Sequence, residues 1–173
     1  MPRASNSIQT GPSSSFSSCS IQQIYEVFLS FRGETRNSFT DHLYHALIEK
    51  EIITFKDDTE LEWENPISLE IFDAIKNLKI AVIILSKNYA YSTWCLRELA
   101  KIVECMKERL RVLPIFYLVD PSHVRHQKKT FAKAFAKHEK DFKENPEREQ
   151  ILQKWKAALR YVADLSGRSL DNR

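Results

Sequence analysis

Ile80-Ala-Val-Ile-Ile-Leu85 is the stretch of this 173-residue sequence that decides its fold. All six residues are apolar, and a continuous apolar run of this length is typical of a strand that a parallel sheet buries on both faces. A helix that crosses a bilayer needs about 20 apolar residues, and no run in the sequence approaches that length. We therefore expect a central strand at this position, in a soluble protein that has no membrane partner.

Strand and helix patterns alternate on both sides of this stretch. Besides Ile80–Leu85, strand patterns occupy Tyr25–Phe31, Ile52–Phe55 and Val112–Val119. Apolar residues at helical spacing predict helices over Thr35–Glu49, Ile67–Asn77, Thr93–Lys107, Thr130–Asp141 and Glu149–Leu165. The alternation is typical of βα units and predicts a single α/β domain, built on a flavodoxin-like doubly wound parallel sheet. Four strands are clear in the sequence; the fifth strand that a flavodoxin-like order requires is not evident.

The loops that follow these strands are the expected place of a functional site. In doubly wound sheets, ligands bind beyond the carboxyl ends of the strands. The loops in question are Arg32-Gly33, Lys56–Asn65, Ser86–Trp94 and Asp120–Gln127.

Composition limits the classes of function and of partner. A hydrophobic share of 43% and a charged share of 28% are ordinary for a globular domain. The net charge of +3 is too small to indicate a nucleic-acid partner, and acidic residues are interspersed in the most basic stretch, residues 125–156. The three cysteines form no CxxC pair, so we expect reduced thiols and no metal site.

The first two dozen residues differ from the rest. Met1–Ser20 holds eight serines and no acidic residue, a composition that cannot bury enough apolar surface to fold. An organelle transit peptide would carry more arginine than the single Arg3. We expect residues 1–23 to form a disordered, serine-rich leader and residues 24–171 to form the folded domain.

Several motifs resemble those of plant-type TIR (Toll/interleukin-1 receptor) domains. They are Tyr25-Glu-Val-Phe-Leu-Ser-Phe-Arg-Gly-Glu34, Phe39-Thr-Asp-His-Leu43, Thr54-Phe-Lys-Asp-Asp58, Leu85-Ser-Lys-Asn-Tyr-Ala90, Trp94-Cys-Leu-Arg-Glu-Leu99, Pro114-Ile-Phe-Tyr117 and Asp120-Pro-Ser-His-Val-Arg125. They follow one another in the order found in that family, from about residue 25 to residue 170. The resemblance implies the TIR fold and an enzyme of plant innate immunity. Such an enzyme uses NAD⁺ or NADP⁺ as its substrate, needs no further cofactor, and releases signalling nucleotides when it is self-associated.

The residue that the resemblance marks as catalytic is Glu98. Nicotinamide leaves from a bond whose nitrogen already carries positive charge, so its departure needs no general acid. A carboxylate beside the ribose can stabilise the oxocarbenium-like transition state or orient the attacking hydroxyl. Glu98 lies three and four residues after Cys95 and Trp94, so all three can share one helical face. Without the motif, a glutamate on a long helix is more often a solvated charge.

The resemblance implies five further contacts with the nucleotide. Trp94 would lie beside the nicotinamide mononucleotide half, and Arg32 would use its planar guanidinium on a phosphate. Gly33 would allow a close approach of the backbone. Lys56 and Ser92 are weaker candidates, since Ser92 is also well placed to cap the helix that begins at Thr93.

The resemblance also implies contacts with other TIR domains. One would use Asp41-His42 on the first helix, and another the loop 57–66, which completes the pocket of a neighbouring subunit. That loop departs from the family pattern, since Trp63 and Glu64 stand where the family has arginine and glycine. Gly33-Glu-Thr-Arg36 is also one residue shorter than the family's usual sequence. A catalytically weak or inactive TIR that binds other TIR domains is therefore the rival hypothesis.

Three points remain: a rival protein class with the same fold pattern, the cellular location, and whether the chain is part of a larger protein. A phosphorelay receiver shares the flavodoxin-like pattern, but Ser86 stands where its phosphorylated aspartate should end the third strand. We expect location in the cytoplasm, with the nucleus as an alternative, because the cysteine pattern suits a reducing compartment. A free-standing TIR protein and one piece of a larger immune receptor both fit the sequence.

Overall fold

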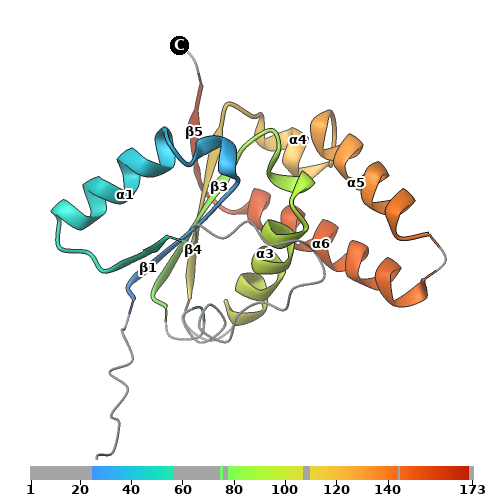
Figure 1. The fold of residues 1–173 in the computed structure, drawn as a ribbon, viewed down its shortest axis with the longest axis horizontal. Helices are drawn as coiled ribbons and strands as arrows, with labels where there is room; N and C mark the ends of the chain where they lie inside the picture. The colour runs from blue at the N-terminus through green and yellow to red at the C-terminus, as the bar shows by residue number, and fades with distance from the viewer. Residues whose placement is uncertain (1–24, 57–74, 76–77, 107–109, 144, 172–173) are drawn as a thin grey trace, which may run out of the picture.

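The computed structural model describes residues 25–56, 75, 78–106, 110–143 and 145–171. It contains one sheet, built from β1 (Val27–Phe31), β2 (Thr54–Lys56), β3 (Ile80–Leu85), β4 (Arg111–Tyr117) and β5 (Arg168–Leu170). Every pair of neighbouring strands is parallel, and the strand order is β2-β1-β3-β4-β5. The flavodoxin-like parallel sheet is confirmed, with Ile80–Leu85 as its central strand (Figure 1).

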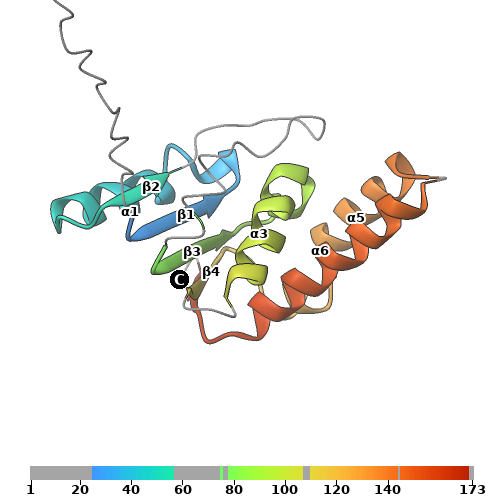
Figure 2. The same ribbon diagram turned by 90° about the horizontal axis from the view of Figure 1, so that it is seen from below.

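The sheet divides the hydrophobic core into two layers. On one face, the even-numbered Val82 and Ile84 of β3 pack with Leu29 and Phe31 of β1 beneath α1 (Phe39–Glu49). On the other face, Ala81, Ile83 and Leu85 pack under the remaining helices. They include α3 (Thr93–Cys105), α5 (Thr130–Asp141) and α6 (Pro146–Asp164), which lie opposite α1 in Figure 2. The continuous apolar run of β3 is thus explained by burial on both faces.

Most predicted helices are found with small changes at their ends. The helix over Thr130–Asp141 is confirmed at both ends. The last helix begins three residues earlier than expected, because Asn145 caps it and Pro146 occupies its first turn. A short helix, α4 (Pro121–Arg125), was not predicted. The helix predicted over Ile67–Asn77 lies outside the described residues except for the buried Ile75.

The start of the first predicted helix was wrong. Instead of a helix from Thr35, the chain forms a 3-10 turn, η1 (Gly33–Thr35), and α1 begins only at Phe39. Thr35 is fully buried, and its hydroxyl lies 2.7 Å from the hydroxyl of Thr40 and donates to the carbonyl oxygen of Arg32. These side-chain bonds stabilise a separate turn, as is common for threonine.

The fifth strand, which the sequence did not reveal, lies at the edge beside β4. Arg168–Leu170 pairs with Ile115–Tyr117, and the amide of Leu118 donates to the carbonyl oxygen of Leu170. The preceding residue, Gly167, lies so close to β4 that a Cβ atom there would be 2.4 Å from the carbonyl oxygen of Pro114. A three-residue strand held mainly by backbone bonds has no apolar pattern, which is why it escaped prediction.

Two further expectations concern the serine-rich leader and membrane-spanning helices. The serine-rich leader predicted at residues 1–23 lies outside the described residues. Within the described ranges, none of the helices combines the length and the apolar character needed to span a bilayer.

Candidate active site

The first turn of α3 lies at the carboxyl edge of the sheet, directly after β3. A 3-10 turn, η2 (Tyr89–Tyr91), connects the strand to Ser92, the N-cap of α3. The hydroxyl of Ser92 accepts a hydrogen bond from the amide of Cys95 at 3.2 Å. The capping role anticipated for Ser92 is therefore confirmed, and its contact with a nucleotide stays a prediction.

Glu98 is not a solvated charge. Its side chain is 2% exposed and lies on the face of α3 that packs against β1. Trp94, one turn earlier on the same face, donates its indole N–H to Oε1 of Glu98 at 3.0 Å. Ser30 of β1 donates its hydroxyl to Oε2 at 3.1 Å. The predicted sharing of one helical face by Trp94, Cys95 and Glu98 is confirmed, and both carboxylate oxygens accept hydrogen bonds from buried donors.

Two residues that sequence reasoning missed complete this cluster. The Tyr89 hydroxyl lies 2.8 Å from Oγ of Ser30 and 3.3 Å from the carbonyl oxygen of Cys95. Burial raises the pKa of Tyr89 well above its usual value, and the nearby Cys95 and Glu98 raise it further. A serine in the middle of an apolar strand was the available signal for Ser30, whereas Tyr89 gave no such signal.

Arg32 and Gly33 lie at the same edge of the sheet, immediately after β1. The thiol of Cys95 donates to the carbonyl oxygen of Phe31, which joins the end of β1 to the first turn of α3. The backbone that continues into Arg32 and Gly33 therefore starts beside the first turn of that helix. Glu34 of η1 accepts hydrogen bonds from the backbone amide and the side-chain amide of Asn88, so the first and third loops are also tied together.

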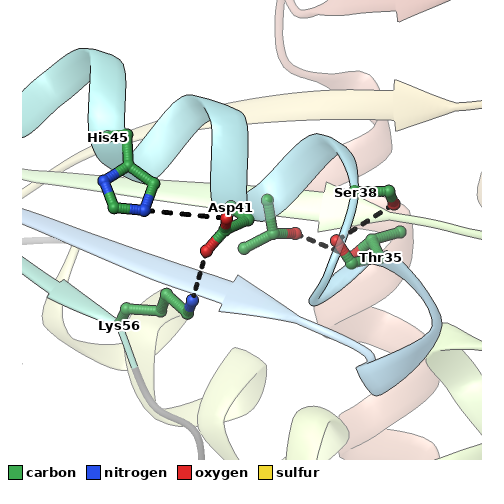
Figure 3. A network of polar contacts seen from close by, with 6 residues as sticks. Thr35, Ser38, Asp41, His45 and Lys56 are labelled. Carbon is green, nitrogen blue, oxygen red and sulfur yellow. Dashed lines mark hydrogen bonds and ion pairs between the residues drawn. The ribbon is translucent and has the colours of Figure 1, made fainter.

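Lys56 lies on the other side of the sheet. It pairs with Leu29 in the β1–β2 register, and Leu29 belongs to the layer beneath α1. Its ammonium lies 3.1 Å from Oδ1 of Asp41 on α1 (Figure 3). The same ammonium lies 5.2 Å from the centre of the Tyr44 ring. The structure therefore brings Arg32, Gly33, Ser92, Trp94 and Glu98 to one edge, and it places the Lys56 ammonium against α1 instead. The altered loop residues Trp63 and Glu64 lie outside the described residues.

This geometry belongs to a protein with many recognisable relatives. The family model described as the TIR domain matches residues 24–173. The chain is 52% identical over 160 residues to the TMV resistance protein N of Nicotiana glutinosa, which covers 91% of this chain and 14% of that protein. It is 46% identical over 166 residues to the disease resistance protein RPV1 of Vitis rotundifolia, covering 95% of this chain and 11% of that protein. The chain thus spans about a seventh or less of these relatives.

A solved structure supports the same assignment. The TIR domains of the activated Roq1 resistosome, which directly recognises the pathogen effector XopQ, superimpose with a TM-score of 0.76 at 50% sequence identity. The match covers 86% of this chain and 89% of that chain. Family model, sequence relatives and fold agree, and the chain belongs to the TIR domain family, as a TIR domain of the plant disease-resistance type.

Proposed function

We propose that this TIR domain is an NAD⁺ hydrolase that cleaves the bond between nicotinamide and ribose when it is self-associated. Its products would act as signalling nucleotides in plant innate immunity. The observation that carries the proposal is the buried carboxylate of Glu98, held between the indole N–H of Trp94 and the hydroxyl of Ser30. Desolvating a carboxylate costs free energy, and such sites are more common in catalysis than on passive helix faces.

Cleavage of the bond between nicotinamide and ribose mainly requires a negative charge that is correctly positioned. The bond between C1′ and the nicotinamide nitrogen breaks with its electron pair going to nicotinamide, which neutralises the ring. The sugar that remains gains positive charge, and a carboxylate in a water-poor site stabilises it strongly. In this proposal, Trp94 packs against the nicotinamide mononucleotide half, Arg32 pairs with a phosphate, and Gly33 lets the backbone approach the ligand closely.

Self-association supplies the step that the isolated chain lacks. Glu98 is 2% exposed and Trp94 is 3% exposed, so the carboxylate must be uncovered before it can reach a ribose. The related Roq1 TIR domains are described within an assembled resistosome. We propose that this chain assembles through Asp41-His42 on α1 and through residues 57–66, and that assembly opens the site. His42 is exposed, as such a contact requires.

A second candidate function has its own support. A TIR domain that binds other TIR domains without turnover would keep Glu98 buried as a structural group. Trp63 and Glu64, which replace the family's arginine and glycine, favour this alternative because they alter the loop that completes a neighbour's pocket.

The deciding experiment measures NAD⁺ loss and nicotinamide release by the purified chain at high concentration with a crowding agent. Glu98→Gln keeps the size of the side chain and removes its charge, so we expect turnover to fall by about 100-fold or more. Glu104→Gln is the matched control, because Glu104 is an exposed glutamate on the same helix. We expect that control to retain full turnover.

Absence of NAD⁺ turnover in the wild type would favour the second candidate, a TIR domain that only binds other TIR domains. A folded chain that does not consume NAD⁺ would contradict the enzyme for the isolated domain. Restoring arginine at position 63 and glycine at position 64 then separates two causes. Turnover that appears in this variant means that assembly was the missing part, whereas continued inactivity means that the chemistry is absent.

A further inference from the structure

Three buried oxygen-bearing side chains form a continuous chain of contacts behind the candidate site. They come from three elements: Ser30 from β1, Tyr89 from η2 and Glu98 from α3. Tyr89 is fully buried, Ser30 is 1% exposed and Glu98 is 2% exposed. The contacts are 3.1 Å from Ser30 to Glu98, 2.8 Å from Ser30 to Tyr89, and 3.3 Å from Tyr89 to the carbonyl oxygen of Cys95.

Counting protons fixes the direction of these bonds when Glu98 is ionised. A serine hydroxyl carries a single proton, and an ionised carboxylate can only accept. Ser30 must therefore donate to Oε2 of Glu98, and the short contact to Tyr89 requires Tyr89 to donate to Ser30. The raised pKa of Tyr89 keeps this phenol protonated and able to donate at neutral pH.

The same atoms serve equally well when Glu98 carries a proton. A protonated Oε2 donates to Oγ of Ser30, the Ser30 hydroxyl rotates to donate to Tyr89, and Tyr89 rotates to donate to the carbonyl oxygen of Cys95. Trp94 continues to donate to Oε1 in both arrangements. Rotation of two hydroxyl groups thus converts one arrangement to the other, and each of these buried donors keeps an acceptor.

We infer that Ser30 and Tyr89 are positioning residues that let the buried Glu98 take up and give back a proton by reversing this chain of hydroxyl groups. The inference rests on the proposed function, and it assigns Glu98 the part of proton acceptor. Water attacks C1′ and forms the C–O bond while the C1′–N bond breaks toward nicotinamide. The proton of the attacking water goes to Glu98 and then to solvent, so the products are ADP-ribose, nicotinamide and one proton.

Titratable groups at this chain of contacts come from η2 and α3. Tyr89 comes from η2, and Cys95 and Glu98 come from α3. Ser30 of β1 does not titrate. Arg97 is the neighbouring cation on α3, with its guanidinium 5.7 Å from the centre of the Trp94 ring. Burial lowers the pKa of Arg97, which remains charged at neutral pH.

The indole N–H of Trp94 provides a readout that does not depend on turnover. Because it donates to Glu98, its NMR resonance should move when the carboxyl group titrates. The test records this resonance against pH in ¹⁵N-labelled protein, identified by its loss in Trp94→Phe. It compares the wild type with Ser30→Ala and Tyr89→Phe. Ser166→Ala and Tyr161→Phe are matched controls, since both residues are exposed.

The two variants should shift the midpoint in opposite directions. Ser30→Ala removes a charge-assisted donor from the ionised carboxylate and only a weaker, neutral acceptor from the protonated form, so the midpoint should rise by about one pH unit. Tyr89→Phe leaves that donor in place but deprives Ser30 of its acceptor when Glu98 is protonated. The midpoint should then fall by about half a unit or more. Ser30→Ala should also lower NAD⁺ turnover by about tenfold and move its pH profile in the same direction, and Ser30→Thr should restore both.

Unchanged midpoints in both variants, or a Trp94 resonance that stays constant in all proteins, would overturn the inference. Shifts in one common direction would also overturn it, because the chain would then not reverse. Opposite shifts in a protein without NAD⁺ turnover would support the hydroxyl chain and contradict the proposed enzyme. NAD⁺ turnover with unshifted midpoints would support the proposed enzyme and contradict the hydroxyl chain.

Discussion

Lys56, the last residue of β2, forms an ion pair with Asp41 in the first turn of α1, with 3.1 Å between Nζ and Oδ1 (Figure 3). The Lys56 side chain is 13% exposed, and the other carboxylate oxygen of Asp41 lies 3.6 Å from Nε2 of His45. The resemblance implied a nucleotide contact for Lys56, but this ion pair places its ammonium against α1. Asp41 is a proposed contact with other TIR domains, so the pair connects the end of β2 to that proposed interface.

The first prediction concerns the free energy of this pair. A double-mutant cycle of Asp41→Asn and Lys56→Met, followed by urea unfolding, should give a coupling of about 0.5 to 1 kcal/mol. The partly exposed carboxylate keeps the value small. Repeating the cycle at high salt should reduce the coupling, because screening weakens partly exposed charges. A coupling of zero at low salt would contradict the ion pair.

The second prediction separates the two roles considered for Ser92. Ser92→Ala removes the acceptor of the Cys95 amide and should lower the free energy of unfolding by about 1 kcal/mol. Ser92→Asp keeps a capping oxygen, so its stability should stay close to that of the wild type. If Ser92 only caps α3, the Asp variant also keeps its NAD⁺ turnover. Loss of turnover in a stable Ser92→Asp protein would instead show that this position meets the negatively charged substrate.

The third prediction concerns stability in acid. His138 is buried among Phe135, Phe142 and Trp155, and its Nε2 lies 2.8 Å from the carbonyl oxygen of Ala90. Because a carbonyl only accepts, Nε2 carries a proton and donates to Ala90. Burial lowers the pKa of His138 in the folded state below 6.5; the bond to Ala90 and the charge of Asp141 raise it in part, and Lys137 lowers it further.

The unfolded chain therefore binds a proton more readily than the folded chain. The contribution of His138 to the free energy of unfolding is present above about pH 6.5. It is lost as the pH falls toward the lower pKa of the folded state, with a slope of up to about 1.4 kcal/mol per pH unit. Thermal unfolding between pH 7 and pH 5 measures this slope. His138→Gln, which keeps a donor to Ala90, should flatten it, and the exposed His126→Gln should not. Equal slopes in all three proteins would contradict the assignment.

The fourth prediction concerns the edge strand. In Gly167→Ala the new Cβ would lie 2.4 Å from the carbonyl oxygen and 2.7 Å from Cγ of Pro114, so β5 must move. We expect a loss of about 1 to 3 kcal/mol in the free energy of unfolding and faster hydrogen exchange at the amide of Leu118. Ser166→Ala, at the exposed neighbouring residue, is the control. An unchanged Leu118 amide in Gly167→Ala would contradict the close approach.

The parts of the fold that hydrophobic patterns specify could be predicted from the sequence. Ile80–Leu85 is buried on both faces, and Thr130–Asp141 repeats its apolar residues with helical spacing, so both were found. Arg168–Leu170 was not, because its place depends on backbone bonds to β4 rather than on its side chains. The start of α1 was missed because the hydroxyl of Thr35 bonds locally and forms a separate turn.

The site could be predicted only where its residues are close in sequence. Trp94 and Glu98 lie one helical turn apart, so their shared face followed from spacing alone. The burial of Glu98 depends on Ser30, which is 68 residues away, and no local pattern predicts that contact. The face on which Lys56 lies could have been predicted from the sequence, because strand alternation puts Lys56 on the face opposite Phe55.

The parallel sheet has a consequence for the order of events in folding. Ser30 on β1 and Glu98 on α3 are 68 residues apart, and β1 and β3 are joined by a long connection rather than a tight turn. Contacts between residues so distant in sequence form slowly, because closing the intervening loop costs conformational entropy before the contact stabilises the chain. We therefore expect partly folded molecules, in which β1 has not yet reached α3, to lack the Ser30 donor to Glu98.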